Sequence, residues 1–326
     1  MASLQTQLSG NRFLVIGRAG MDLYPDPPGT PIEEASQFTA GLGGSSANIA
    51  AGLSRLGASA ALATRVSDDA VGRFAINALH NFGVDTSHVH SISGEFRNSL
   101  ALSESRMKGH QTVIYRNGAA DFQMVPEDIE AIDFSRYDAI ITTGTVLAAE
   151  PSRTSALLAF DKARDAGIPL IFDVDYRPYS WTSPQEAADV YSRAAALCDV
   201  IVGNDDEFGF MANGYDQGLN KARDLAHTTA ALVVYKMGAK GAITLTPDET
   251  IETGIYPVDA LKPVGAGDAF LAGLVASLAQ ERDLRTSILR GSASASIVVS
   301  RVGCAIAMPT PEELDQFIST HPGPTS

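Results

Sequence analysis

The sequence predicts an α/β protein in which helices cover both faces of a doubly wound, mostly parallel β-sheet. Three observations lead to this prediction. Short β-branched runs alternate with amphipathic helical patterns, hydrophobic residues make up 45% of the 326 residues, and no stretch resembles a linker between domains. A chain of this length and composition can form one continuous core, so we expect a single domain over residues 1–326.

Each predicted strand is a short run of mainly aliphatic residues, which is typical of parallel strands buried on both faces. These runs occupy residues 13–16, 60–66, 139–141, 169–172, 200–202 and 231–234. Apolar residues recur at helical spacing over residues 45–56, 69–82, 152–166, 184–196, 216–227, 267–280, 284–300 and 311–319. In such a sheet, ligands bind at the carboxyl ends of the strands.

Two segments interrupt this alternation of strands and helices. Residues 18–40 are rich in proline and glycine, and residues 95–117 alternate in the manner of exposed strands. We expect both segments to leave the main sheet and to form a small β flap over its edge.

The charge and the terminal sequence exclude several classes of protein. A net charge of −14 repels a phosphate backbone, so nucleic acid is not expected as a partner. The sequence contains no apolar run of about 18 residues that would span a membrane, and the N-terminus has no apolar signal segment. A cytoplasmic location without membrane association is therefore expected. The motifs of P-loop nucleotide sites, HExxH metalloproteases, nucleophile elbows and dinucleotide-binding turns are also absent from the sequence.

The strongest local signal is the segment of small residues Gly265, Ala266 and Gly267, followed by Asp268, at the start of a predicted helix. Backbone N–H groups at such a start can hold the charge of a transferring phosphoryl group, and a carboxylate there can accept the proton of an attacking hydroxyl. Alternatively, the glycines only allow close packing and Asp268 caps the helix.

A second glycine-rich turn contains Gly43, Gly44 and Asn48 and leads into the helix predicted over residues 45–56. The glycines would let a polar ligand approach the backbone, and Asn48 offers both a donor and an acceptor to a hydroxyl. As an alternative, Ser45 or Ser46 is an ordinary helix N-cap.

Further polar residues follow predicted strands. The acidic cluster at residues 204–207 is suited to holding Mg²⁺ through water, and the alternative is a solvated acidic loop. Residues 236–241 could lay phosphates along backbone and ammonium groups, or could form a simple hairpin turn.

Together these segments resemble the signatures of the ribokinase family of carbohydrate kinases, also called the phosphofructokinase-B family, over nearly the whole chain. The resemblance implies a ribokinase-like fold with a β-strand lid, formed here by residues 18–40 and 95–117, and phosphorylation of a sugar hydroxyl by ATP with Mg²⁺. It also implies a role for individual residues: Asp268 as catalytic base, Gly265 to Gly267 as anion hole, Asp22, Gly43, Gly44 and Asn48 for the sugar, Asn204 and Glu207 for Mg²⁺, Lys236, Gly238 and Gly241 for the phosphates, and Ser292 to Ser296 for adenine.

A finer likeness is to the family members of inositol catabolism, whose acceptor is an open-chain keto-deoxy sugar acid. It is carried by residues 115–121, 173–181 and 292–310. A carboxylate is well matched by an arginine fork, and Arg116 and Arg177 are the candidates. Either arginine could instead pair with Asp173 or Asp175. The alternatives to this acceptor are another sugar acid, fructose, or a sensor that binds sugar without turnover.

The chain departs from the family pattern at Lys262, where many members carry an aspartate of a monovalent-cation site. A lysine cannot ligate K⁺, but its ammonium group could occupy the place of that cation beside the anion hole. We therefore expect activity that does not depend on K⁺. Lid strands in this family often pair between two subunits, so a homodimer through these strands is also expected.

Overall fold

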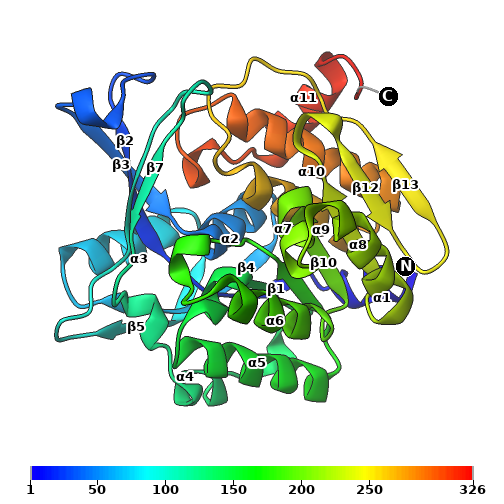
Figure 1. Cartoon of the computed structure of the whole chain (residues 1–326), viewed down its shortest axis with the longest axis horizontal. Coiled ribbons are helices and arrows are strands. Elements are labelled where there is room, and N and C mark those ends of the chain that lie inside the picture. Colours follow the sequence, from blue (N-terminus) through cyan, green and yellow to red (C-terminus); the bar gives the residue numbers. More distant parts are fainter. Residues whose placement is uncertain (1, 325–326) are drawn as a thin grey trace.

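The computed structural model describes residues 2–324, in which a nine-stranded β-sheet forms the centre (Figure 1). Its strands are β1 (Arg12–Ile16), β4 (Ser59–Ser67), β5 (Asp85–Ile92), β8 (Ala139–Thr143), β9 (Leu170–Asp173), β10 (Val200–Asn204), β11 (Leu232–Lys236), β12 (Ala242–Leu245) and β13 (Thr250–Thr253). They lie in the order β13-β12-β11-β10-β9-β8-β1-β4-β5. All pairs from β5 to β11 are parallel, and the pairs that involve β12 are antiparallel.

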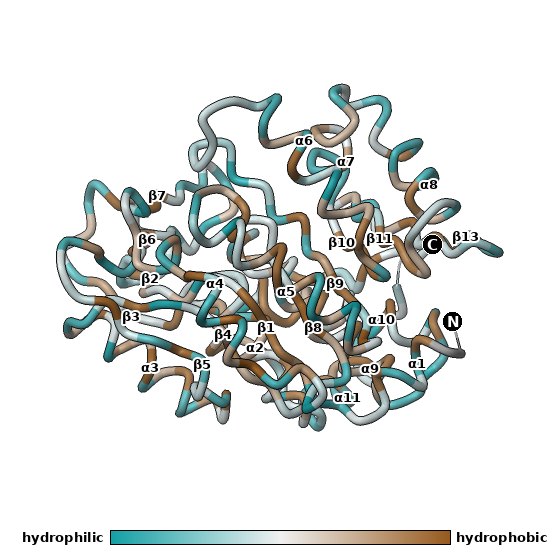
Figure 2. Tube along the Cα trace, turned by 90° about the horizontal axis from the view of Figure 1, so that it is seen from below, coloured by the Kyte–Doolittle hydropathy of each residue, from teal (hydrophilic) through white to brown (hydrophobic). Residues whose placement is uncertain are grey.

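Helices cover both faces of the sheet because side chains alternate along each strand. Phe13 and Val15 of β1 belong to one core cluster, and Leu14 and Ile16 belong to the other. The first cluster includes side chains of α1 (Ala2–Leu8), α2 (Ser45–Arg55), α3 (Ala70–Asn81), α9 (Ala266–Ala279), α10 (Leu284–Val299) and α11 (Pro311–Thr320). The second includes side chains of α4 (Pro126–Glu130), α5 (Ser152–Ala166), α6 (Pro184–Ala195), α7 (Asp205–Met211) and α8 (Gly218–Thr228). Figure 2 shows hydrophobic residues concentrated in the central strands.

A second, four-stranded sheet projects from one side of the molecule in both views (Figures 1 and 2). Its strands are β2 (Gly20–Pro25), β3 (Phe38–Gly43), β6 (Leu100–Ser103) and β7 (Thr112–Tyr115), in the order β3-β2-β6-β7. Glu104, which is fully buried, accepts hydrogen bonds from the backbone N–H groups of Ile32 and Gln111, both at 2.9 Å. This carboxylate therefore joins the two chain segments that build the small sheet.

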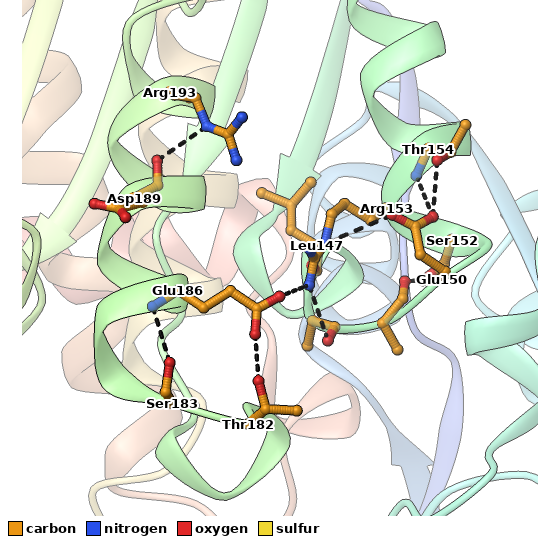
Figure 3. A network of polar contacts seen from close by, with 12 residues as sticks. Leu147, Glu150, Ser152, Arg153, Thr154, Thr182, Ser183, Glu186, Asp189 and Arg193 are labelled. Carbon is orange, nitrogen blue, oxygen red and sulfur yellow. Dashed lines mark hydrogen bonds and ion pairs between the residues drawn. The ribbon is translucent and has the colours of Figure 1, made fainter.

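Arg153 of α5 connects the segment after β9 to its surroundings (Figure 3). Its guanidinium donates to the carbonyl oxygen of Leu147 at 2.7 Å and to the carboxylate of Glu186 of α6 at 2.9 Å. The same guanidinium lies 5.1 Å from the ring centroid of Trp181. The hydroxyl of Ser183 accepts the Glu186 N–H at 3.1 Å and so caps α6. Residues 173–183 begin beside the cavity described below, and these contacts hold the opposite end of the segment.

The predicted fold class is confirmed, and each predicted strand and helix is present within a few residues of its expected bounds. The segments 18–40 and 95–117 supply the strands of the second sheet, with β3 continuing to Gly43. The sequence analysis missed α1, α4, α7, β5, β12 and β13. β5 is an edge strand with polar, half-exposed side chains, and α7 begins inside the acidic segment 204–207, for which the sequence favours a magnesium site with a solvated loop as the alternative. Over residues 2–324, no helix combines the length and apolarity needed to cross a bilayer.

Close packing of α2 against α9 requires a glycine at position 52. A Cβ atom there would lie 2.8 Å from the Cβ of Ala272 in α9 and 3.2 Å from the sulfur of Met308. Overpacking of this kind costs about 1–3 kcal/mol. We expect Gly52→Val to lower the melting temperature by roughly 2–10 °C in a thermal unfolding scan.

Gly323→Val is the matched control for this prediction. A Cβ at position 323 would meet nothing within 4 Å, so its melting temperature should stay near that of the unchanged protein. Equal melting temperatures for the two variants would show that the α2–α9 contact tolerates a larger side chain.

Candidate active site

A cavity of about 810 Å³ opens where the carboxyl ends of the central strands face the second sheet. One wall consists of residues from β6 and β7, including Ser103, Thr112 and Ile114. The opposite wall follows β9, β10 and β11 and includes Asp173, Asn204 and Lys236. The starts of α2 and α9 close the space between these walls. The cavity therefore lies where the doubly wound topology predicts a ligand.

The start of α9 carries Asp268 into this cavity. Gly265, with a φ angle of 86°, precedes the helix and makes no side-chain cap. The carboxylate of Asp268 accepts a hydrogen bond from the hydroxyl of Ser45 at 2.6 Å and one from the amide nitrogen of Asn48 at 2.8 Å. Both donors lie in the first turn of α2. Asp268 is thus oriented by a neighbouring helix, and the alternative that it caps α9 is wrong.

The environment of Asp268 shifts its affinity for protons. Burial raises the pKa of the Asp268 carboxyl to about 6, and the negative charge of Asp175 adds to this effect. The hydrogen bonds from Ser45 and Asn48 and the charge of Arg177 act in the opposite direction. A carboxylate with a pKa near 6 is ionised at neutral pH and is better matched to a hydroxyl proton than an ordinary aspartate.

The glycines before α2 make room for other polar groups. A Cβ at Gly43 would lie 1.8 Å from a carboxylate oxygen of Asp22, and Gly43 itself is not among the residues that line the cavity. Gly44 has a φ angle of 100° and precedes the helix as its N-cap without a side-chain hydrogen bond. Neither Ser45 nor Ser46 caps α2, so that alternative is also wrong.

Unpartnered acceptors lie beside Asp268. One oxygen of Asp22 and the amide oxygen of Asn48 are buried and have no hydrogen-bond partner, and both residues line the cavity. Leaving a buried acceptor unpaired costs about 1–3 kcal/mol, which a ligand hydroxyl would recover. These two atoms are therefore suited to a polyhydroxylated ligand.

The predicted magnesium residues form a helix cap. The carboxylate of Glu207 accepts the N–H groups of Asn204 at 2.7 Å and of Tyr176 at 3.1 Å, and the side-chain oxygen of Asn204 accepts the Glu207 N–H at 2.8 Å. Both residues line the cavity, so the alternative of a solvated loop does not hold for them. No group of three or more histidine, cysteine, aspartate or glutamate side chains within residues 2–324 is arranged to hold a metal ion.

Buried carboxylates gather along the strand ends. Burial and neighbouring acidic groups raise the pKa of Asp173 well above its ordinary range and also raise the pKa of Glu207. The ammonium group of Lys236 lowers both values. A Cβ at Gly267 would lie 3.3 Å from the Lys236 nitrogen, which places this cation against the start of α9.

The remaining nucleotide candidates line one end of the cavity. Gly238 and Gly241 belong to the turn between the antiparallel strands β11 and β12, so the segment is both a hairpin turn and part of the cavity wall. Ser292 and Ser296 also line it, whereas the Ser294 hydroxyl is turned toward the carbonyl oxygen of Arg290 at 2.9 Å. The segment 253–260, which the sequence patterns did not indicate, adds apolar residues such as Ile255, Tyr256 and Val258 to the lining.

Both predicted arginines line the cavity, and each is paired with a carboxylate of the protein. Arg116 contacts Asp121, with Nε at 3.1 Å, and its guanidinium lies 4.1 Å from the ring centroid of Phe122. Arg177 pairs with Asp175 at 2.6 Å. The alternative of an internal ion pair is therefore right for Arg177, whereas Arg116 pairs with Asp121 instead of Asp173 or Asp175.

Arg18, which the sequence analysis missed, lines the same cavity. Within the described part of the chain it forms no ion pair with a carboxylate, and its guanidinium donates to the Ser99 hydroxyl at 2.8 Å. The signal that could have identified it is its position directly after the first buried strand, at a strand carboxyl end.

Lys262 is fully buried at the floor of the cavity. Its ammonium group donates to the carbonyl oxygens of Val264 at 2.7 Å and Val298 at 3.1 Å. Burial lowers the pKa of Lys262, while the charges of Asp268 and Asp22 act to raise it. The positive charge is therefore held by backbone dipoles next to the start of α9.

Comparison with known proteins places this geometry in a family. Residues 11–311 match the model of the pfkB family of carbohydrate kinases. The chain is 38% identical to a 5-dehydro-2-deoxygluconokinase of Geobacillus kaustophilus and 35% identical to one of Photobacterium profundum. These alignments cover 95% and 94% of this chain, and 94% of each relative.

Solved structures agree with this placement. A fructokinase of Vibrio cholerae in its fructose, ADP and potassium ion bound form superposes with a TM-score of 0.81 at 27% identity, covering 95% of this chain and 98% of that one. A PfkB protein of Polaromonas superposes with a TM-score of 0.79 at 26% identity, covering 90% and 98%. The resemblance drawn from the sequence signatures is thereby confirmed. The chain belongs to the pfkB family of carbohydrate kinases, which are phosphotransferases with an alcohol group as acceptor.

Proposed function

We propose that this kinase transfers the γ-phosphoryl group of ATP to the 6-hydroxyl of 5-dehydro-2-deoxy-D-gluconate. Relatives named 5-dehydro-2-deoxygluconokinase match nearly the whole chain at 35–38% identity. Their name is the basis for the proposed acceptor. The observation that carries the chemistry is the Asp268 carboxylate, which Ser45 and Asn48 orient toward a cavity large enough for a sugar and a nucleotide.

Asp268 acts as the general base in this proposal. It accepts the proton of the acceptor hydroxyl as the oxygen attacks the γ-phosphorus, and the bond from that phosphorus to the β,γ-bridging oxygen of ATP breaks. The unpartnered oxygens of Asp22 and Asn48 accept hydrogen bonds from other hydroxyls of the sugar. Catalysis then depends mainly on positioning and on charge stabilisation.

The start of α9 receives the charge of the transferring group. The N–H groups of Gly265, Ala266 and Gly267 have no carbonyl partner within the helix and carry the positive end of its dipole. Lys236 stands beside them, and Gly238 and Gly241 leave room for the polyphosphate chain. Ser292 borders the adenine end.

The donor set fits a magnesium ion that arrives with ATP. Both oxygens of Glu207 accept backbone N–H groups, and no cluster of protein ligands is present within residues 2–324, so Asn204 and Glu207 would hold the ion through water. When bound, the ion neutralises charge on the transferring phosphates. A fructokinase of Vibrio cholerae, also of this fold, has been solved in its fructose, ADP and calcium ion bound form.

The small sheet forms the acceptor side of the cavity and is proposed to be a lid. Its closure over the substrates would exclude water and so favour transfer over hydrolysis of ATP.

The experiment that tests this function measures ATP consumption by the purified protein with Mg²⁺. The acceptors are 5-dehydro-2-deoxy-D-gluconate, 2-dehydro-3-deoxy-D-gluconate, fructose and none. Preference for the first supports the proposed acceptor. Preference for another acceptor keeps the chemistry and rejects the substrate, and binding without turnover for all of them would indicate a sensor.

Removing the base should abolish most of the activity. We expect Asp268→Asn to fold normally and to lower kcat by about 100-fold or more.

In the unchanged enzyme, kcat/KM should fall by about tenfold per pH unit below pH 6, because the Asp268 carboxyl, with a pKa of about 6, is then protonated and cannot accept a proton.

Asp165→Asn is the control for Asp268→Asn, since Asp165 is exposed on α5 and does not line the cavity. Unchanged turnover in Asp268→Asn would refute the assignment of the base.

We further propose that the ammonium group of Lys262 replaces a monovalent cation. The rate should then be the same within about twofold in K⁺, Na⁺ or choline salts of equal ionic strength, since the charge beside the anion hole is part of the chain. Lys262→Ala should lower kcat, and added K⁺ or NH₄⁺ should restore part of it by binding to the carbonyl oxygens of Val264 and Val298. Strong stimulation of the unchanged protein by K⁺ would contradict this proposal.

A homodimer through the small sheet is proposed as well. Val113 and Tyr115 of β7 are 40% and 60% exposed and project from one face of the strand, and Phe38 of β3 is 37% exposed. Tyr115→Glu should shift the sedimentation coefficient to that of a monomer. Tyr215→Glu, which changes a tyrosine of similar exposure beyond α7, should leave the dimer intact. A monomeric unchanged protein at micromolar concentration would reject this arrangement.

A further inference from the structure

Arg18 is held in place by both its backbone and its side chain. Its carbonyl oxygen accepts the N–H of Ala47, in the first turn of α2, at 3.2 Å. A Cβ at Gly44 would lie 2.4 Å from the same oxygen, so only glycine allows α2 to start this close to the chain. Arg18 is therefore fixed next to the residues that hold Asp268.

The guanidinium lies against the chain segments that lead into β2 and β6 of the small sheet. One terminal nitrogen donates to the hydroxyl of Ser99, which is fully buried, at 2.8 Å. A Cβ at Gly20 would lie 3.1 Å from that nitrogen and 2.7 Å from both the hydroxyl and the carbonyl oxygen of Ser99. Any larger side chain at position 20 would displace the contact. Gly20 thus leaves room for the guanidinium of Arg18, and Ser99 holds it by a hydrogen bond.

The charge of Arg18 distinguishes it from the other arginines that line the cavity. Arg116 and Arg177 are each neutralised by an aspartate at ion-pair distance. For Arg18, no carboxylate of the described chain lies within ion-pair distance, and its remaining guanidinium nitrogens donate no hydrogen bond there. Asp22 is near enough to sense its charge, which partly offsets the rise that burial causes in the pKa of Asp22.

We propose that Arg18 binds the carboxylate of the acceptor, an inference that rests on the proposed sugar-acid substrate. An arginine with free donors can bind a carboxylate through two parallel hydrogen bonds. Arg18 lines the same cavity as the unpartnered oxygens of Asp22 and Asn48, which suit hydroxyls, and its charge acts on Asp22. Arg116 and Arg177, whose charges are already paired, shape the cavity around the bound acid.

The competing explanation is that Arg18 only supports Asp22. Its loss would then impair every acceptor equally, because Asp22 contacts hydroxyls that all of them share. A role in carboxylate binding impairs only the acid. The acid must therefore be compared with a neutral analogue that is otherwise the same.

The experiment measures kcat and KM for 5-dehydro-2-deoxy-D-gluconate and for its carboxamide. We expect the unchanged enzyme to prefer the acid by about 10- to 100-fold in kcat/KM, as is typical for a charge-assisted hydrogen-bonded pair. Arg18→Gln should remove this preference by raising KM for the acid, with the carboxamide constants changed by less than about threefold. Arg18→Lys should retain part of the preference, since it keeps the charge but loses the fork.

Two further variants complete the design. Arg193→Gln is the matched control, because Arg193 is exposed on α6 and does not line the cavity (Figure 3). Ser99→Ala removes the support of the guanidinium without touching its charge, and should weaken the acid preference by a smaller factor. If Arg18→Gln lowers the melting temperature, the kinetics of Ser99→Ala test the proposal in its place.

The outcomes separate the inference from the function on which it rests. Turnover of neither compound by the unchanged enzyme rejects the proposed acceptor, and the assignment of Arg18 to it falls with it. Equal use of acid and carboxamide by the unchanged enzyme keeps the kinase activity but overturns the carboxylate assignment. An acid preference that survives in Arg18→Gln, or an equal loss for both acceptors, also overturns it.

Discussion

The hydrogen bonds between the first turn of α2 and Asp268 are the constraint on which the site depends. Ser45 and Asn48 are separated from Asp268 by more than 200 residues of sequence, yet they hold both of its oxygens at 2.6 and 2.8 Å. Those bonds form only if α2 and α9 pack closely on the same face of the sheet, which Gly52 permits. Close packing of α2 against α9 and the orientation of the Asp268 carboxylate therefore depend on each other.

The distribution of charge follows from the same arrangement. Parallel strands end side by side, so Asp173 at the end of β9 and the Asn204–Glu207 cap after β10 lie close to Asp268. Burial raises the pKa of each of these carboxyls, and Lys236 and Arg177 compensate only in part. A site with this excess of buried acid is prepared to receive additional positive charge together with its anionic nucleotide.

Local patterns were sufficient to predict the fold class, most elements and the two glycine-rich segments. Runs such as residues 200–202 are buried on both faces, and a helix such as α6 has strong periodicity, so both leave a clear signal. The choice of partners could not be predicted in this way. Asp121 neutralises Arg116, and Ser99 supports Arg18 from a segment 81 residues further along the chain, so these pairings depend on tertiary contacts. Likewise, the acidic pattern of residues 204–207 does not reveal that Asn204 and Glu207 cap a helix, because capping depends on backbone geometry.

Lys262 gives the site a positive charge that is covalently attached to the chain. A diffusible ion occupies its site according to mass action, so its charge is present for only part of the time when the ion is scarce. The ammonium group held by the carbonyl oxygens of Val264 and Val298 is present in every molecule at every salt concentration. It can be lost only by deprotonation, which burial favours. Under the proposal that this ammonium group replaces a monovalent cation, the dependence on dissolved K⁺ is exchanged for a dependence on pH.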